Sequence, residues 1–280
     1  MTDLPATNAL ELTLEDGWLQ VVLDRPRNRN ALSAELAGEL VKVFEEIRDD
    51  RGVRGVSLRG RGGVFCAGAD LKAFAAIEAA GDAAQSMAKD MSHAGARLFR
   101  LIDTAPQVTV ALIEGAAMAG GFGLACACDL AAATENTRFA LTETRIGLTP
   151  AQIAPYVLRR LGTSAGRRLM LLGSVFDGAE AERIGLVDRL VSDGSGLDAF
   201  EQEVRAQVLA CAPGAIAATK EVIAASARLA PDDLAELAAE RFAAGLVGAE
   251  GREGVASFIE RRPPSWANSR HREVGESNGE

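Results

Sequence analysis

The sequence predicts an α/β protein that ends in an all-helical region. Short apolar segments with the character of strands alternate with amphipathic helical segments in the first part of the chain. Glycine-rich turns follow two of these apolar segments, and the stretch from Leu197 to about Glu260 is helical and rich in alanine. We therefore divide the chain into an α/β core of residues 1–195, a helical region of residues 196–262 and a mobile polar tail of residues 263–280.

The individual elements follow from apolar spacing and from turn residues. Residues 10–14 and Trp18–Leu23 alternate apolar and polar side chains around Asp16-Gly17, which predicts a β-hairpin. Ser33 is placed to cap a helix whose apolar residues recur every three or four positions. Further strands are expected at 53–58, 108–113, 130–133, 139–141 and 187–191, and further helices at 70–102 with a break at 79–82, at 151–172, and at 197–260 with breaks at Pro213 and Pro231.

Composition and charge exclude several classes of protein. Hydrophobic residues make up 48% of the 280 residues and charged residues 25%, the balance of a globular protein. No apolar run approaches the ~20 residues of a membrane helix, and the polar N-terminus is unlike a secretory signal. The net charge of −9 argues against a nucleic-acid partner. A cytoplasmic enzyme is the expectation.

The sequence holds no pattern of metal ligands or disulfides. A C-x-C pair lies in an apolar run, and the spacing of cysteines and histidines fits neither a zinc site nor a disulfide framework. We expect buried, reduced thiols and no metal. The residues concerned are Cys66, Cys126, Cys128, Cys211, His93 and His271.

The segment of residues 65–72, FCAGADLK, is predicted to run from a strand through a glycine turn into a helix that begins near Asp70. The first turn of a helix leaves backbone N–H groups unpaired and carries a partial positive charge, which suits an oxyanion. Asp70 fits a capping position. An ordinary strand-to-helix turn explains this segment equally well on its own.

A second segment, residues 114–129, repeats this arrangement. A buried strand precedes glycines at 120, 121 and 123, which allow a ligand to approach the backbone closely. The segment matches neither the dinucleotide fingerprint nor a phosphate-binding loop. Two such turns together can aim two N–H groups at one carbonyl oxygen, and a thioester that becomes an enolate is a suitable occupant.

Glu143 is a lone carboxylate between apolar stretches. In a partly apolar pocket its pKa would rise, which suits general acid–base catalysis near neutral pH. The alternative is a surface glutamate paired with Arg138 or Arg145, which the segment alone favours.

The chain resembles the crotonase (enoyl-CoA hydratase/isomerase) superfamily over roughly residues 10–266. The resemblance implies a spiral of ββα units with a helical C-terminal region that forms a homotrimer or a dimer of trimers. It also implies an acyl-CoA substrate and no cofactor beyond its coenzyme A moiety. The motifs that carry the resemblance are DRP at 24–26, NALS at 30–33, FCAGADLK at 65–72, the glycine-rich run from 115 to CD at 128–129, Glu143 with Gly147 and Pro150, and EG at 253–254 with FIERR at 258–262.

The resemblance also implies roles for individual residues. The backbone N–H groups of Ala69 and Gly120 match the family's oxyanion-hole donors, and Glu143 matches the second of the two glutamates used by hydratases. The position of the first glutamate aligns with Gly123. Coenzyme A contacts would fall on Arg27, Arg29, Ala67, Leu71 and Lys72, with Phe258 and Arg261 from a neighbouring subunit.

One glutamate instead of two leaves two activities open. It is the pattern of Δ3,Δ2-enoyl-CoA isomerases, and also of hydratases for branched glutaconyl-CoA thioesters. Residues 120–126 and 150–157 resemble isohexenylglutaconyl-CoA hydratase, with methylglutaconyl-CoA hydratase as a near relative. We therefore expect a hydratase for a branched glutaconyl-CoA, with an isomerase as the alternative and a non-catalytic acyl-CoA binder as a third. Arg145 is a candidate for the second carboxylate of such a substrate.

Overall fold

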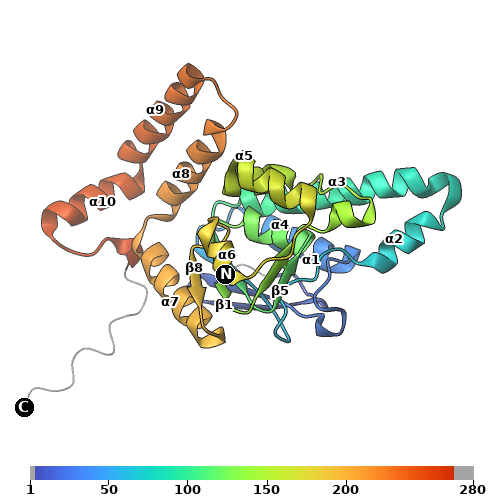
Figure 1. Ribbon diagram of the computed structural model, residues 1–280. Coiled ribbons are helices and arrows are strands. Elements are labelled where there is room, and N and C mark those ends of the chain that lie inside the picture. The colour runs from blue at the N-terminus through green and yellow to red at the C-terminus, as the bar shows by residue number, and fades with distance from the viewer. Residues whose placement is uncertain (1–3, 268–280) are drawn as a thin grey trace, which may run out of the picture. The chain divides into compact units, whose positions relative to one another are not determined.

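The computed structural model describes residues 4–267. By its internal contacts the chain forms two compact units, residues 1–203 and 204–280, whose division falls within helix α7 (Gly194–Ala210). Most of the predicted tail, from residue 268 onward, lies outside the described residues. The first unit contains the sheets and the candidate site (Figure 1).

A six-stranded sheet forms the centre of the first unit. Its strand order is β1-β2-β3-β4-β6-β8, in which β1 and β2 form an antiparallel hairpin and all other neighbours are parallel. A second sheet of two parallel strands pairs β5 with β7. The strands are β1 (Leu10–Glu15), β2 (Trp18–Leu23), β3 (Gly55–Gly60), β4 (Val108–Ile113), β5 (Ala116–Met118), β6 (Leu130–Thr134), β7 (Arg138–Ala140) and β8 (Arg189–Val191).

Four helices of the first unit pack against one another in succession, in the order α1, α3, α4 and α5. Helix α3 packs against α1 and α4, and α4 packs against α5. Ser33 caps α1 by accepting a hydrogen bond from the Leu36 N–H at 3.2 Å, as the sequence predicted. The helices are α1 (Ala34–Glu46), α2 (Leu71–Glu78), α3 (Ala84–Asp103), α4 (Gly120–Ala127), α5 (Ala154–Leu172) and α6 (Gly178–Arg183), with short 3₁₀ turns at Pro26–Asn28, Gly81–Ala83 and Glu143–Ile146.

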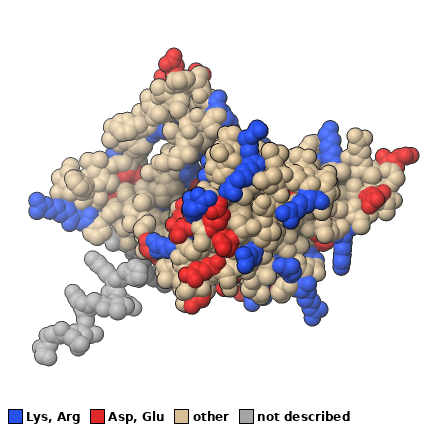
Figure 2. Space-filling model, viewed as in Figure 1, with Lys and Arg blue, Asp and Glu red and all other residues tan. Residues whose placement is uncertain are grey.

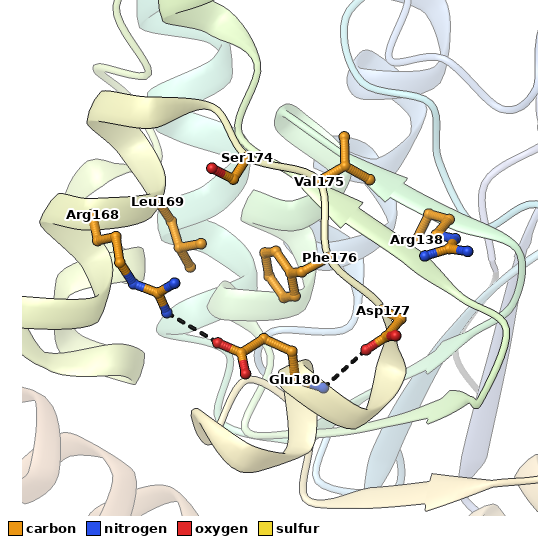
Figure 3. A pocket seen from close by; sticks show the side chains of 8 residues that line it. All are labelled: Arg138, Arg168, Leu169, Ser174, Val175, Phe176, Asp177 and Glu180. Atoms are coloured by element: carbon orange, nitrogen blue, oxygen red, sulfur yellow. Dashed lines mark hydrogen bonds and ion pairs between the residues drawn. The ribbon is translucent and has the colours of Figure 1, made fainter.

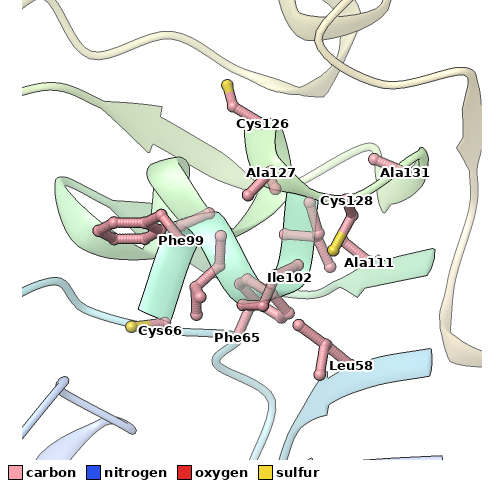
Figure 4. Packing of buried hydrophobic residues seen from close by; sticks show 14 of the residues in the cluster. Leu58, Phe65, Cys66, Phe99, Ile102, Ala111, Cys126, Ala127, Cys128 and Ala131 are labelled. Carbon is pink, nitrogen blue, oxygen red and sulfur yellow. The ribbon is translucent and has the colours of Figure 1, made fainter. Parts of the chain in front are cut away.

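The core lies between the sheet and these helices. Phe65, Phe99 and Phe122 are buried in one apolar cluster, and Figure 4 shows Phe65 and Phe99 packed near Cys66. Burial raises the pKa of Cys66 to about 12, so this thiol stays protonated at neutral pH. Cys126 is buried in the same cluster, and its pKa is likewise raised to about 12.

A buried carboxylate joins α7 to the sheet. Glu201 is 4% exposed and accepts hydrogen bonds from Trp18 Nε1 at 2.9 Å, Gln20 Nε2 at 3.2 Å and Ser57 Oγ at 2.5 Å. A buried charge is tolerated only when its oxygens are satisfied in this way. These bonds fix the start of α7 against β2 and β3.

The second unit consists of helices. They are the end of α7, α8 (Pro213–Ser226), α9 (Pro231–Val247) and α10 (Ala249–Glu260), followed by a 3₁₀ turn at Ser265–Ala267. Within the described residues α8 packs against α9, and α9 against α10. Pro213 and Pro231 each open a helix, where the missing N–H of proline is not needed.

The predicted elements differ from the structure in several places. Helix α6 was not expected, and the helical region has a further break at Gly248, between α9 and α10. Strand β5 was not expected, because its three residues have no apolar alternation and are held by pairing with the distant β7. The strand expected at 53–58 is β3, Gly55–Gly60. The helix expected from residue 151 begins at Ala154 and is interrupted at Gly162, whose φ of 72° and ψ of 170° are not helical.

Two observations bear on membrane proteins and nucleic-acid binders, the classes that the composition argued against. Among the described helices, none is long and apolar enough alone to cross a membrane; α7 and α8 pass such a test only as a pair, bent by 103° at their junction. On the face shown in Figure 2, Lys and Arg side chains are dispersed rather than gathered in one continuous basic area.

Candidate active site

Two strand-to-helix turns lie side by side in the first unit. The Cys66 N–H donates to the Ala116 carbonyl at 3.0 Å, and the Met118 N–H donates to the Cys66 carbonyl at 3.0 Å. Gly68 continues this close approach, because a Cβ added there would lie 3.0 Å from both the Met118 carbonyl oxygen and the Ala119 Cβ. The turn before α2 and the turn before α4 are therefore in direct contact, as the oxyanion-hole interpretation requires.

The Ala69 N–H is directed away from the strand pairing that holds its neighbours. Leu32 N–H donates to the Gly68 carbonyl at 2.7 Å, and Asp70 N–H donates to the Leu32 carbonyl at 3.4 Å. In such a parallel bridge the N–H of the middle residue points to the other side. Within residues 4–267 the Ala69 N–H has no protein acceptor. Asp70 caps α2 as predicted, through the Lys72 N–H at 3.0 Å.

The Gly120 N–H is the first donor of α4 and also has no acceptor among the described residues. The first N–H groups of a helix lack intrahelical partners. A Cβ at position 120 would lie 2.7 Å from Leu32 Cδ1, so glycine is needed for this approach. Leu32 thus contacts both turns, one through its backbone and the other through its side chain. The NALS motif contained this residue, but no feature of the sequence pointed to this role.

Glu143 follows strand β7 and begins a 3₁₀ turn. The β5–β7 pairing and the bond from the Ala119 N–H to the Ala140 carbonyl, 2.8 Å long, join this segment to the turn before α4. One carboxylate oxygen of Glu143, Oε2, is buried and has no hydrogen-bond partner in the described structure. Burial raises the pKa of this carboxyl above its ordinary value.

The alternative explanation of Glu143, a surface ion pair, does not fit. Within residues 4–267 neither Arg138 nor Arg145 forms an ion pair with Glu143. The stem of Arg145 instead lies against Gly173, where an added Cβ would be 3.1 Å from Arg145 Cγ. A buried carboxylate oxygen without a hydrogen-bond partner lowers the stability of the folded state. Such groups are found at sites that act on a ligand.

Apolar side chains occupy the space beside Gly123. A Cβ added at this glycine would lie 2.3 Å from Ile153 Cγ2 and 3.1 Å from Phe99 Cε1. Ile153 is 3% exposed and Phe99 4%, so neither side chain has open space to move into. The space that the side chain of the family's other glutamate would take is therefore occupied by side chains from α3 and from the segment before α5. The sequence showed the glycine, but not that the side chains of Ile153 and Phe99 fill the space beside it. We call these two side chains the wall beside Gly123.

The residues predicted to contact coenzyme A fall on two joined segments. Ala67 N–H donates to the Arg29 carbonyl at 3.0 Å, which places residues 25–32 beside residues 67–72. Arg27 and Arg29 are exposed and form no ion pair in the described part of the chain. A hollow of about 400 Å³ is lined by Asn8, Asp24, Arg25, Pro26, Arg27 and Asn28.

The remaining predicted contacts are exposed. Leu71 is 64% exposed, and Lys72 follows it in the first turn of α2. Phe258 and Arg261 belong to the second unit, at the end of α10, where Phe258 is 86% exposed. The contribution of these last two residues from a neighbouring subunit stays a prediction.

A second hollow, of about 360 Å³, involves none of the predicted site residues (Figure 3). Arg168 pairs with Glu180 across it at 3.0 Å, and the Glu180 N–H donates to Asp177 Oδ1 at 3.1 Å. Hydrogen bonds from Arg183 and Arg168 lower the pKa of Glu180. These charges satisfy one another, so the hollow gives no sign of a ligand. No three His, Cys, Asp or Glu residues within 4–267 gather as a possible metal site.

The chain is similar to known proteins over most of its length. Residues 13–269 match the family described as Enoyl-CoA hydratase/isomerase. The solved structure of Pseudomonas aeruginosa AtuE is 44% identical, with a TM-score of 0.89 over 93% of this chain and 100% of that one. An enoyl-CoA hydratase/isomerase from Marinobacter aquaeolei is 38% identical, with a TM-score of 0.89 over 92% of this chain and 99% of its own.

A relative named as a carnitinyl-CoA dehydratase, from Proteus mirabilis, is 34% identical over 93% of this chain and 98% of its own length. The similarity thus extends over nearly the whole chain in sequence and in structure. The fold is that of the crotonases, and the chain belongs to the enoyl-CoA hydratase/isomerase family, which acts on acyl-CoA thioesters.

Proposed function

We propose that the protein is a hydratase that adds water across the 2,3 double bond of a branched glutaconyl-CoA, such as isohexenylglutaconyl-CoA or methylglutaconyl-CoA. The observation that carries the proposal is the buried Oε2 of Glu143, which has no partner within the described residues. A carboxylate whose pKa is raised by burial is a suitable base for water near neutral pH.

In the proposed reaction the thioester oxygen accepts hydrogen bonds from the N–H groups of Ala69 and Gly120. Glu143 takes a proton from water, and the hydroxide oxygen bonds to C3 of the substrate. The electron pair of the 2,3 double bond moves through C2 to the thioester oxygen and forms an enolate, which the two N–H groups stabilise. The proton held by Glu143 then passes to C2, directly or through solvent, so that one water molecule is added in total.

The wall beside Gly123 supports a site with one carboxylate. Ile153 and Phe99 fill the space that a second glutamate would need, so in the proposed reaction Glu143 activates water and returns the proton, directly or through solvent. The similarity to a protein named as a dehydratase supports chemistry that adds or removes water. The branched glutaconyl substrate is supported by the resemblance of residues 120–126 and 150–157 noted above.

A glutaconyl substrate carries a second carboxylate that needs a cationic partner. We propose Arg145, which is exposed, lies two residues after Glu143 and forms no ion pair within residues 4–267. Arg27, Arg29 and Lys72 would meet the phosphates of coenzyme A, with Ala67 and Leu71 beside the pantetheine chain. Phe258 and Arg261 would complete the site from a neighbouring chain in a homotrimer or dimer of trimers, and no cofactor other than coenzyme A takes part.

An isomerase is the second candidate. A single carboxylate can move a proton between C2 and C4 of a 3-enoyl-CoA, and the filled space beside Gly123 suits this reaction equally well. A non-catalytic acyl-CoA binder ranks below both, because it would have no use for the unpaired oxygen of Glu143.

The decisive experiment incubates the protein with crotonyl-, 3-enoyl-, methylglutaconyl- and isohexenylglutaconyl-CoA and measures product masses and double-bond positions. Addition of one water to the branched thioesters, with little reaction on crotonyl-CoA, is the expected result. A moved double bond at unchanged mass would replace the proposal with isomerisation. The Glu143→Gln variant should fold and lose about 10²–10⁴-fold in kcat; full activity in this variant would rule out Glu143 as the base.

A further inference from the structure

Ala119, which directly precedes α4, has a backbone conformation that alanine rarely adopts. Its φ is 48° and its ψ is −114°. Arg29 and Arg261 also have positive φ, but their ψ values of 37° and 39° place them in the left-handed helical region. The Ala119 angles are instead those of the first central residue of a type II′ turn, a position that glycine normally takes. The backbone is therefore strained at this residue.

Such strain persists only where the surroundings hold it, and three segments around the candidate site contact Ala119. Its N–H donates to the Ala140 carbonyl at 2.8 Å, three residues before Glu143. Its carbonyl accepts the Gly123 N–H at 3.0 Å. Its Cβ lies against the backbone of Gly68, next to the other proposed donor, since a Cβ added at Gly68 would be 3.0 Å away.

The ψ angle of Ala119 sets the plane of the peptide that joins Ala119 to Gly120, and this peptide carries the Gly120 N–H. We propose that Ala119 is a positioning residue: its methyl group and its two backbone hydrogen bonds keep the Gly120 N–H aimed at the thioester oxygen. Glycine at position 119 would adopt the same angles without strain, but it would also allow other orientations of the peptide. The proposal rests on the proposed function in assigning this N–H to the carbonyl.

The test is Ala119→Gly in the full-length protein. We expect kcat to fall about tenfold, less than the ~10²–10³-fold of removing an oxyanion donor, while KM changes by less than about twofold. The thermal midpoint should stay equal or rise, because the strain is relieved. A decrease in the midpoint would overturn the assignment of strain to Ala119, and unchanged kcat would overturn its positioning role.

A spectroscopic measurement separates this proposal from the proposed function. Butyryl-CoA labelled with ¹³C at the thioester carbonyl has no double bond to hydrate, and its carbonyl stretch moves to lower frequency when the oxygen is hydrogen-bonded. The shift on binding should be smaller in Ala119→Gly than in the wild type. If the wild type hydrates nothing but the variant shows this loss, the positioning role holds and the hydratase fails. Equal shifts in both proteins would sink the positioning role alone.

Two variants serve as controls. Ala119→Ser keeps the Cβ and should retain kcat within about twofold; a loss as deep as that of the glycine variant would show that the Cβ does not matter. Asp16→Gly makes the same change at another non-glycine residue with positive φ, 47°, in the β1–β2 hairpin away from the predicted site residues. It should leave both kcat and the carbonyl stretch unchanged, and a loss of kcat there equal to that of Ala119→Gly would refute a local effect.

Discussion

The two helices that follow the proposed donors differ sharply in their surroundings. Helix α4, after the Gly120 N–H, is buried along its length, with all residues from 121 to 127 inside the core. Helix α2, after the Ala69 N–H, has no buried residue, and its first residue, Leu71, is 64% exposed. The Gly120 N–H is therefore positioned by a helix in the core. The Ala69 N–H is positioned by a surface helix and by the two backbone hydrogen bonds of Leu32.

The proposed oxyanion hole therefore combines one donor fixed by core packing with one donor whose surroundings can adapt. The orientation of the Gly120 N–H is tied to global packing, so it should change only when the core changes. The Ala69 N–H can respond to local changes in α2, which lies among the predicted coenzyme A contacts. We expect substitutions near α4 to act on stability and those near α2 to act on local dynamics and substrate binding.

Hydrogen exchange should show the largest contrast. The Ala79 N–H ends α2 with a 3.1 Å bond to Ala75, and the Cys128 N–H ends α4 with a 3.2 Å bond to Leu124. These two bonds have similar lengths, so a difference of several orders of magnitude in exchange would reflect the packing around them. We expect the Cys128 amide to exchange at least ~10³-fold more slowly than that of Ala79. Similar rates by mass spectrometry or NMR would contradict the comparison.

The next largest effect is expected from Gly123→Glu. The new Cβ would overlap Ile153 Cγ2, and the carboxylate would be buried without a partner, so the variant should lose about 3 kcal/mol of unfolding free energy. Urea denaturation measures this loss. Gly38→Glu is the matched control, because nothing lies within 4 Å of a Cβ at position 38; it should change stability by less than ~0.5 kcal/mol.

Adding Ile153→Ala to Gly123→Glu tests the wall directly. The smaller side chain makes room for the new one, so the double variant should be more stable than the sum of the single effects by about 1–2 kcal/mol. Additive losses would mean that Ile153 does not occupy the space of the missing carboxylate.

On the exposed side, Asp70→Ala should have a smaller and more local effect. It removes the cap of α2, worth about 1 kcal/mol, so the α2 amides should exchange about fivefold faster. The midpoint of global unfolding should hardly move, because no residue of α2 is buried. Asp70→Asn retains a capping side chain and should behave as the wild type. A large loss of global stability in Asp70→Ala would show that α2 is part of the core after all.

The smallest expected effect concerns Glu143 and pH. Its folded pKa is raised above the unfolded value of about 4.5, so the folded state binds more protons between the two values and stability falls as pH rises through this window. Glu143→Gln lacks this loss and should be more stable than the wild type at pH 7, with the gap closing below pH ~4.5. Activity should fall on the acid side of the raised pKa. An equal stability gap at all pH values would contradict this account.

Much of the fold could be predicted from local sequence signals. The hairpin around Asp16-Gly17, the cap at Ser33 and the cap at Asp70 depend on residues near in sequence, and the structure confirms all three. Strand β5 could not be predicted, because it is created by pairing with β7, whose residues lie 22 positions further along the chain. Periodicity carries no information about such distant partners.

The site divides in the same way. The two turns and Glu143 could be proposed from local patterns and from the family resemblance. The unpaired state of Glu143 could not, because Arg138 and Arg145 are near in sequence and the choice between partners is made by tertiary packing. The roles of Leu32 and Ile153 were also beyond the sequence, since each depends on a side chain that meets a glycine from another element.

The wall beside Gly123 also constrains the order in which substitutions at positions 123 and 153 could arise during evolution. Glutamate at position 123 meets Ile153 at once, so a mutation there alone would be removed by selection for folding. A smaller residue at position 153 leaves only a small void, which a stable protein can tolerate. A descendant that gains a second carboxylate must therefore first change Ile153, a residue that takes no part in the proposed chemistry.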